Sequence, residues 1–246
     1  MQRNSLKLKI AYLYPDILQS FCDEANINVF YKRARARNID VEVNEILSHN
    51  KVQASKYDFY YMGGSNYSNL EEAMRYLEEN KNEILSAIDS GVVALLVNCG
   101  FILFGNTFQM LNKAQNKGLG VFNMDSVMIT KHIYSPAFGT CNFLKKRIVA
   151  GFENHNFISN LKSDAIAFLT LKKGTGNNPK DKIKTDGARY KNAIGTYLTS
   201  PVLAQNPHFC DFLIARSLRI KYRTKIPLSR LYDDIEWYSH NYILTN

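Results

Sequence analysis

The sequence predicts an α/β fold with a mainly parallel central sheet, and two observations on the first half of the chain carry this prediction. Strand-like and helix-like segments alternate from residue 6 to about residue 112. The apolar run at 91–98 is short, as a buried strand is, and it leads directly into a helix-like segment. Strands that alternate with helices form a parallel sheet that has helices on both faces.

Each expected element of the first half has a local reason. We expect strands at 6–14, 39–46, 57–62 and 91–98, and helices at 23–38, 70–90 and 99–112. Alternating apolar and polar residues indicate the first two strands, and Pro15 ends the first of them. The segment 70–90 is rich in Glu, Lys, Leu and Ala, which favour helices. Gly63 and Gly64 favour a turn after the third strand.

The second half contains more strand-like segments. We expect them at 119–122, 147–150, 165–171 and 193–198, followed by a helix at 209–222. The tail at 224–246 has no regular pattern and concentrates aromatic residues. Because no repeat or linker interrupts the chain, we expect a single domain over 1–246, with the extreme N-terminus and the tail at its periphery.

Composition and charge exclude some classes of protein. The chain has 246 residues, of which 46% are hydrophobic and 22% charged, values typical of a globular protein with a substantial core. The net charge of +9 raises the question of a polyanionic partner. The basic residues are spread along the chain, and no nucleic-acid-binding motif accompanies them. We therefore expect no specific nucleic-acid partner, and interpret Arg33, Arg35 and Arg37 as the solvated face of a helix.

The cysteines and the N-terminal residues indicate the cellular setting. Cys22, Cys99, Cys141 and Cys210 lie far apart without metal-binding spacing, so we expect no metal, no cofactor and no disulfide framework. The first ten residues lack a signal-peptide core, and no apolar run is long enough to cross a membrane. The expected location is the cytoplasm.

Cys99 is the main candidate for chemistry. It ends the apolar run at 91–98 and begins the helix-like segment. A cysteine at such a turn lies at the carboxyl end of the sheet and at the positive end of a helix, where a thiolate is favoured. This position is typical of a nucleophile. The alternative is a small buried residue that fills the turn, because free cysteine is among the most buried residue types.

Several motifs together indicate a family. Besides the Cys99 turn, they include Gly-Phe-Glu-Asn-His at 151–155 and the run Tyr-Lys-Asn-Ala-Ile-Gly-Thr-Tyr-Leu at 190–198. Further segments lie at 23–26, 33–37, 57–64, 118–121 and 174–178. On these motifs the chain resembles the GatD subunits of the MurT/GatD amidotransferases. These are class I glutamine amidotransferases close to the cobyric acid synthase type, and the resemblance implies a three-layer, flavodoxin-like fold.

The resemblance also implies a reaction. GatD subunits hydrolyse glutamine and pass ammonia to a Mur-ligase-like partner (MurT), which amidates the glutamate of lipid II. On this basis Cys99 is the expected nucleophile, and the backbone N–H groups of Gly64 and Gly100 are the expected oxyanion donors.

The chain departs from the GatD pattern at the reacting groups. Thr199 stands where the resemblance places the dyad histidine, and a threonine hydroxyl has no suitable pKa for general-base catalysis. Lys131 and His132 fall where the family has its glutamine-binding arginine. Three hypotheses follow: an active glutaminase, a non-catalytic subunit that binds the ligase, or a small-molecule binder. Candidates for a substitute base are His132, His155 and His208.

Overall fold

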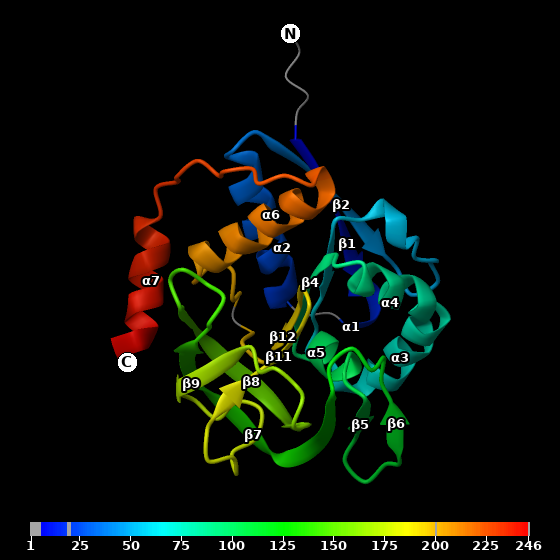
Figure 1. The fold of residues 1–246 in the computed structure, drawn as a ribbon. Coiled ribbons are helices and arrows are strands. Elements are labelled where there is room, and N and C mark those ends of the chain that lie inside the picture. The colour runs from blue at the N-terminus through cyan, green and yellow to red at the C-terminus, as the bar shows by residue number, and fades with distance from the viewer. Residues whose placement is uncertain (1–5, 19–20, 200, 246) are drawn as a thin grey trace.

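The computed structural model describes residues 6–18, 21–199 and 201–245 of the chain (Figure 1). A six-stranded sheet in the order β11-β12-β4-β3-β1-β2 forms its centre. Its strands are β1 (Leu6–Leu13), β2 (Ile39–Ile46), β3 (Phe59–Met62), β4 (Val93–Val97), β11 (Ala188–Tyr190) and β12 (Ala193–Thr196). All neighbours pair in parallel except β11, which is antiparallel to β12. The predicted α/β fold class with a mainly parallel central sheet is confirmed.

Helices cover both faces of this sheet. They are α1 (Pro15–Leu18), α2 (Phe21–Arg35), α3 (Leu70–Glu79), α4 (Lys81–Asp89), α5 (Cys99–Leu103) and α6 (Pro207–Tyr222), with short 3-10 turns η1 (Ala54–Lys56) and η2 (Tyr67–Asn69). Leu8 and Ile10 of β1 belong to the apolar cluster that includes α2 and α6. Ala11 and Leu13 belong to the cluster that includes α3, α4 and α5. Alternate residues of one buried strand therefore supply both cores.

The helix expected at 70–90 is divided in two by Asn80. Its side chain accepts a hydrogen bond from the backbone N–H of Val52 and donates to the hydroxyl of Tyr14, at 2.9 and 3.0 Å. Asn80 is buried, so these bonds satisfy its amide away from water. The break between α3 and α4 thus ties this helical layer to the segment after β2 and to the end of β1.

A second sheet, which the sequence analysis did not predict, adjoins the first (Figure 1). Its strands are β5 (Thr107–Gln109), β6 (Gln115–Lys117), β7 (Met124–Thr140), β8 (Ile148–Leu161), β9 (Leu169–Lys173) and β10 (Thr185–Asp186). The long antiparallel pair β7 and β8 forms most of it. Phe157 of β8 belongs to the same apolar cluster as Tyr197, which follows β12. A shared cluster of this kind supports the single domain over 1–246, which stays a prediction.

Two local predictions next to β4 are wrong. The helix expected at 99–112 is the five-residue α5, and the strand expected at 119–122 is a loop. Both differences have one cause: the N–H groups of Leu119 and Val121 donate to the carbonyls of Leu103 and Phe104 at the end of α5. The loop therefore satisfies the carbonyls that a helix leaves unpaired at its end.

The tail is also more regular than expected, because it contains α7 (Asp234–Thr245) beside the second sheet (Figure 1). His240 and Ile243 of α7 are buried. Arg33 of α2 joins the tail to the helices by hydrogen bonds to Asp233, at 2.7 and 3.1 Å, and to Asp211 of α6, at 2.9 and 3.0 Å. The interpretation of Arg33 and Arg37 as solvated is wrong, since their side chains are 7% and 3% exposed.

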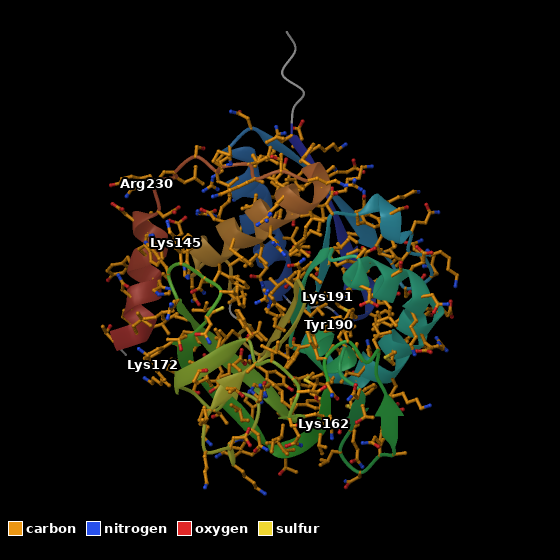
Figure 2. The ribbon with its side chains drawn as sticks, in the orientation of Figure 1. Lys145, Lys162, Lys172, Tyr190, Lys191 and Arg230 are labelled. Atoms are coloured by element: carbon orange, nitrogen blue, oxygen red, sulfur yellow. The ribbon has the colours of Figure 1, made fainter. Side chains whose placement is uncertain are left out.

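Other basic side chains lie on the surface, and Figure 2 shows Lys145, Lys162, Lys172, Lys191 and Arg230 on separate segments. Within residues 6–18, 21–199 and 201–245, no helix has both the length and the hydropathy that a membrane span needs.

Candidate functional site

The site predicted from the sequence lies where three parallel strands end side by side. Met62 of β3 pairs with Leu96 of β4, and Val97 of β4 pairs with Thr196 of β12. The residues that follow these strands therefore meet at one edge of the sheet. Ligands of open α/β sheets bind at this carboxyl edge.

The turn after β4 has its strained residue at Asn98. This residue has φ 50° and ψ −103°, whereas Cys99 is already the first residue of α5. A non-glycine residue with positive φ and such a ψ lies outside the allowed regions and costs free energy, of the order of 1–3 kcal/mol. In a nucleophile elbow, the nucleophile itself occupies the strained turn between strand and helix. Cys99 was expected at this turn, and the structure places it one residue later.

The side chains of Asn98 and Cys99 have different surroundings. The hydroxyl of Tyr67 donates a 2.7 Å hydrogen bond to Oδ1 of Asn98, and Nδ2 of Asn98 lies 3.5 Å from the carbonyl oxygen of Asn154 on β8. Burial raises the pKa of Tyr67 well above its usual value, so its phenol stays protonated and donates. Both residues are fully buried, but only Cys99 belongs to the apolar cluster around α5.

Gly64 and Gly100, the expected oxyanion donors, both lie at close backbone approaches. A Cβ on Gly100 would lie 2.4 Å from the carbonyl oxygen of Met62, and one on Gly64 would lie 2.6 Å from Cβ of Leu18. The carbonyl of Gly64 points toward the elbow, where it accepts a 3.2 Å hydrogen bond from the N–H of Cys99. Their role as oxyanion donors stays a prediction.

Thr199 lies at the same edge, just after β12. Its backbone N–H donates to the carbonyl of Phe152 on β8 at 2.9 Å, and its hydroxyl donates to the same oxygen at 3.3 Å. Leu198 and Glu153 form an isolated antiparallel bridge beside it. The segment expected to carry the general base is thus attached to β8.

The three candidate bases lie in different places. His132 is exposed on β7, and its Nε2 lies 2.8 Å from Oδ1 of Asn154, the residue whose carbonyl faces Asn98. Its neighbour Lys131 is also exposed. The structure therefore places the predicted substrate-binding pair on the strand next to β8, with Asn154 between His132 and the elbow.

His155 is buried in β8 and belongs to a cluster that the sequence analysis did not assemble. Its ring stacks on that of Tyr197 with centroids 3.8 Å apart, and its Nδ1 lies 2.9 Å from the carbonyl oxygen of Phe157. Its Nε2 lies 3.8 Å from Oε2 of Glu153. Glu153 also accepts hydrogen bonds from the N–H groups of Thr175 and Gly176.

The pKa of Glu153 reflects this setting. Burial opposes ionisation, but the nearby imidazole of His155 and the hydrogen bonds from the backbone N–H groups outweigh it and lower the pKa of Glu153 below its usual value. Glu153 is therefore an ionised carboxylate inside the protein. The motif at 151–155 was the signal for this cluster, but the stacking on Tyr197 depends on the tertiary fold.

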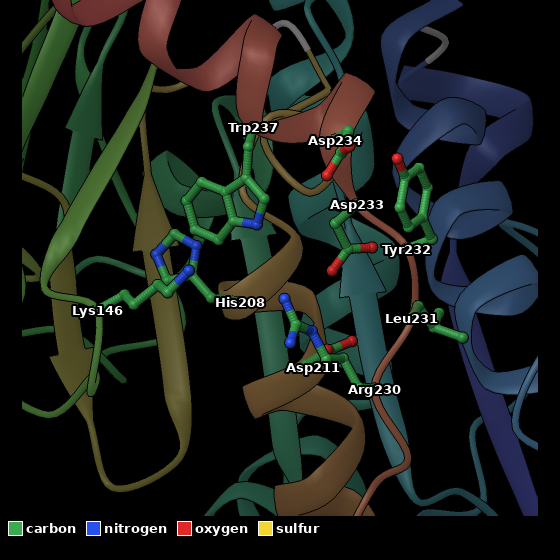
Figure 3. A pocket seen from close by; sticks show the side chains of 9 residues that line it. All are labelled: Lys146, His208, Asp211, Arg230, Leu231, Tyr232, Asp233, Asp234 and Trp237. Carbon is green, nitrogen blue, oxygen red and sulfur yellow. The ribbon is translucent and has the colours of Figure 1, made fainter.

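His208 lies away from the elbow, in a cleft of about 880 Å³ between α6, α7 and the tail (Figure 3). Its Nε2 lies 2.9 Å from the carbonyl oxygen of Ile148, and its ring stacks on Trp237. Burial and the neighbouring His240 lower the pKa of His208 to about 4. The contacts of His208 are structural, and they are made with β8 and the tail rather than with β4 or β12.

Comparisons with known proteins agree with this architecture. Residues 9–207 match the CobB/CobQ-like glutamine amidotransferase domain family. The chain is 28% identical over 221 residues to the lipid II isoglutaminyl synthase (glutamine-hydrolyzing) subunit GatD of Staphylococcus aureus, covering 87% of this chain and 86% of that protein. It is 27% identical over 229 residues to the Streptococcus pneumoniae subunit of the same name, with 93% and 87% covered.

The fold has solved counterparts as well. A crystal structure of a glutamine amidotransferase superposes with a TM-score of 0.56 at 10% sequence identity, covering 85% of this chain and 98% of that one. The family match extends from β1 to the first residue of α6, which includes the strand ends, the elbow and Thr199. The chain belongs to the family of CobB/CobQ-like glutamine amidotransferase domains.

Proposed function

We propose that this chain is the GatD-like subunit of a two-component enzyme, and that a Mur-ligase-like partner in the complex amidates the glutamate of lipid II. Two relatives that carry the GatD name align over most of this chain, which supports the proposal. The family domain occupies residues 9–207, which is most of the chain.

The subunit does not hydrolyse glutamine through a Cys–His dyad. The observation that carries this part of the proposal is Thr199, whose hydroxyl bonds to the carbonyl of Phe152 at the edge where the reaction needs an imidazole. Loss of the base from a coupled nucleophile and base costs about 10³ to 10⁶ in kcat. The ligase then uses free ammonia, and this chain contributes binding and stability.

The exposed outer face of α7 is a candidate surface for binding a protein partner. Its inner face packs on the domain through His240 and Ile243, whereas Ile235, Tyr238 and Tyr242 are 82%, 75% and 58% exposed. Positions i, i+3 and i+7 share one side of a helix. An exposed apolar stripe with tyrosines is typical of protein interfaces, where tyrosine contributes much of the binding energy.

Co-expression with the Mur-ligase-like protein tests the proposal. We expect the two chains to co-purify and the complex to amidate lipid II with ammonium chloride but not with glutamine. Glutamate release from glutamine that disappears in Cys99→Ala would contradict the loss of hydrolysis. Failure of the chains to co-purify would contradict the partnership.

A matched pair of variants tests the surface. Ile235→Ser with Tyr238→Ser should weaken co-purification, because it removes apolar area from the outer face of α7. Ile183→Ser is the control, since Ile183 is 70% exposed in the loop between β9 and β10. Equal binding by the α7 variant and the control would exclude this face as the interface.

A further inference from the structure

Asn98 occupies the strained backbone position in the turn after β4, where a nucleophile elbow has its nucleophile. Among the residues from Val93 to Leu103 in β4, the turn and α5, Asn98 alone has a positive φ. The carbonyl of Asn98 accepts the N–H of Ile102 at 3.0 Å, and its own N–H donates to Thr196 at 2.9 Å. The strained turn is therefore held from both sides, by the helix that follows and by β12.

The role of each residue at such an elbow follows from its geometry. The residue at the strained turn presents its side chain to the active site, and the N–H of the next residue helps to form the oxyanion hole. Cys99 occupies that next position. Its N–H donates a hydrogen bond to the carbonyl of Gly64 across the edge of the sheet, and its side chain is part of the core.

Asn98 has the contacts expected of a side chain at the reacting position. Its amide meets Tyr67 of η2 on one side and the backbone of β8 on the other. His132 contacts the side chain of Asn154, whose backbone carbonyl faces Asn98. The predicted substrate-binding segment is therefore connected to Asn98 through this residue of β8. A neutral carboxamide cannot attack an amide carbonyl as a thiolate does.

We propose that Asn98, and not Cys99, stands at the nucleophile position of this glutaminase fold, so that the chain has lost both reacting groups. This inference rests on the proposed function and deepens it, because it moves the missing nucleophile to a named residue. The loss of the base at Thr199, taken alone, predicts that a histidine at 199 restores activity. The assignment of Asn98 predicts instead that Thr199→His stays inactive, since Cys99 faces the core.

A set of four proteins tests the assignment. They are the wild type, Thr199→His, Asn98→Cys with Cys99→Ala, and the triple variant Asn98→Cys, Cys99→Ala and Thr199→His. Replacing Cys99 in the last two prevents a disulfide between adjacent thiols. Each protein is incubated with the chloroketone analogue of glutamine. A reactive thiolate displaces chloride from this probe, forming a carbon–sulfur bond, and peptide mass spectrometry locates the adduct.

We expect an adduct at position 98 in both variants that carry Asn98→Cys, and none at Cys99 in the wild type or in Thr199→His. Glutamate release should be about 10²-fold higher in the triple variant than in the double variant, as expected for an added general base. Melting temperatures show which variants are folded. Formation of the adduct does not require turnover, so the probe locates the reactive thiol even where hydrolysis is not restored.

Two outcomes would overturn the assignment. One is an adduct on Cys99 or hydrolysis by Thr199→His, since either makes Cys99 the nucleophile. The other is a folded double variant that stays unlabelled at 98. These results are independent of co-purification with the ligase, so failure of the inference and failure of the proposed partnership are distinguishable.

Discussion

The hydroxyl of Tyr67 donates a 2.7 Å hydrogen bond to Oδ1 of Asn98 and so connects η2 to the strained turn after β4. Asn98 is fully buried, which makes this bond one of the few means of satisfying its amide. The turn keeps its unusual backbone conformation because the neighbouring elements determine it.

Tyr67→Phe should therefore lower the free energy of unfolding by about 1–3 kcal/mol, because it leaves a buried acceptor unsatisfied. Urea denaturation measures the change. Tyr60→Phe is the matched control, since the buried hydroxyl of Tyr60 has no hydrogen-bond partner among the residues that the structure describes, and its loss should be neutral or stabilising. Equal destabilisation by the two substitutions would contradict the importance of the Tyr67 bond.

Arg33 provides a second test, because it holds the tail. Arg33→Ala removes the guanidinium that Asp211 and Asp233 share, and because Asp211 keeps its bond from Arg37 it should destabilise the protein by about 3 kcal/mol, the lower end for a broken buried pair. Arg35→Ala, on the same helix, removes an exposed pair with Asp40 and should cost less than about 1 kcal/mol. Thermal unfolding compares them, and limited proteolysis should detect early cleavage after residue 223 in the Arg33 variant only.

His208 predicts a pH dependence of stability. Its pKa in the folded protein is about 4, below the usual value of 6.5, because burial and the charge of His240 disfavour the imidazolium. The unfolded chain therefore binds the proton more readily, and the contribution to stability is present above pH 6.5 and is lost as pH falls toward 4. The loss at the lower limit is about 3 kcal/mol.

The groups that face His208 are Lys146, Asp211, Trp237 and His240, and of these Asp211 favours the charged imidazolium. His240 also has a lowered pKa, so it contributes to the same decrease. His208→Gln should flatten the profile of unfolding free energy between pH 7 and pH 4.5. A variant profile that parallels that of the wild type would assign the acid sensitivity to other groups.

Gly100 should tolerate no side chain, because its Cβ would lie 2.4 Å from the carbonyl oxygen of Met62. Gly100→Ala forces α5 away from β3 and should cost about 1–3 kcal/mol. Gly151→Ala is milder, since the nearest atoms to its Cβ would be those of the Leu198 side chain, at 3.3 Å and beyond. Guanidinium denaturation of both variants would contradict this order if Gly151→Ala were the less stable.

Local sequence patterns were sufficient to predict a strand where its buried residues alternate with exposed ones. Alternation predicted β2 at 39–46, the span that the structure has. Local patterns were insufficient to predict β7, because its central residues Lys131 and His132 are exposed and give no strand-like pattern. The loop at 119–122 looked like a strand because it is apolar, but its N–H groups bond to the end of α5.

The motifs and the periodicity were enough to predict the family and the strand ends that meet at the candidate site, because both are local properties of the chain. Which of two adjacent residues, Asn98 or Cys99, takes the strained turn could be seen only in the folded chain. That choice depends on β12, η2 and the start of α5, which hold the backbone from three directions. The burial of Arg33 could likewise be seen only in the folded chain, because its partners Asp211 and Asp233 are 178 and 200 residues away along the sequence.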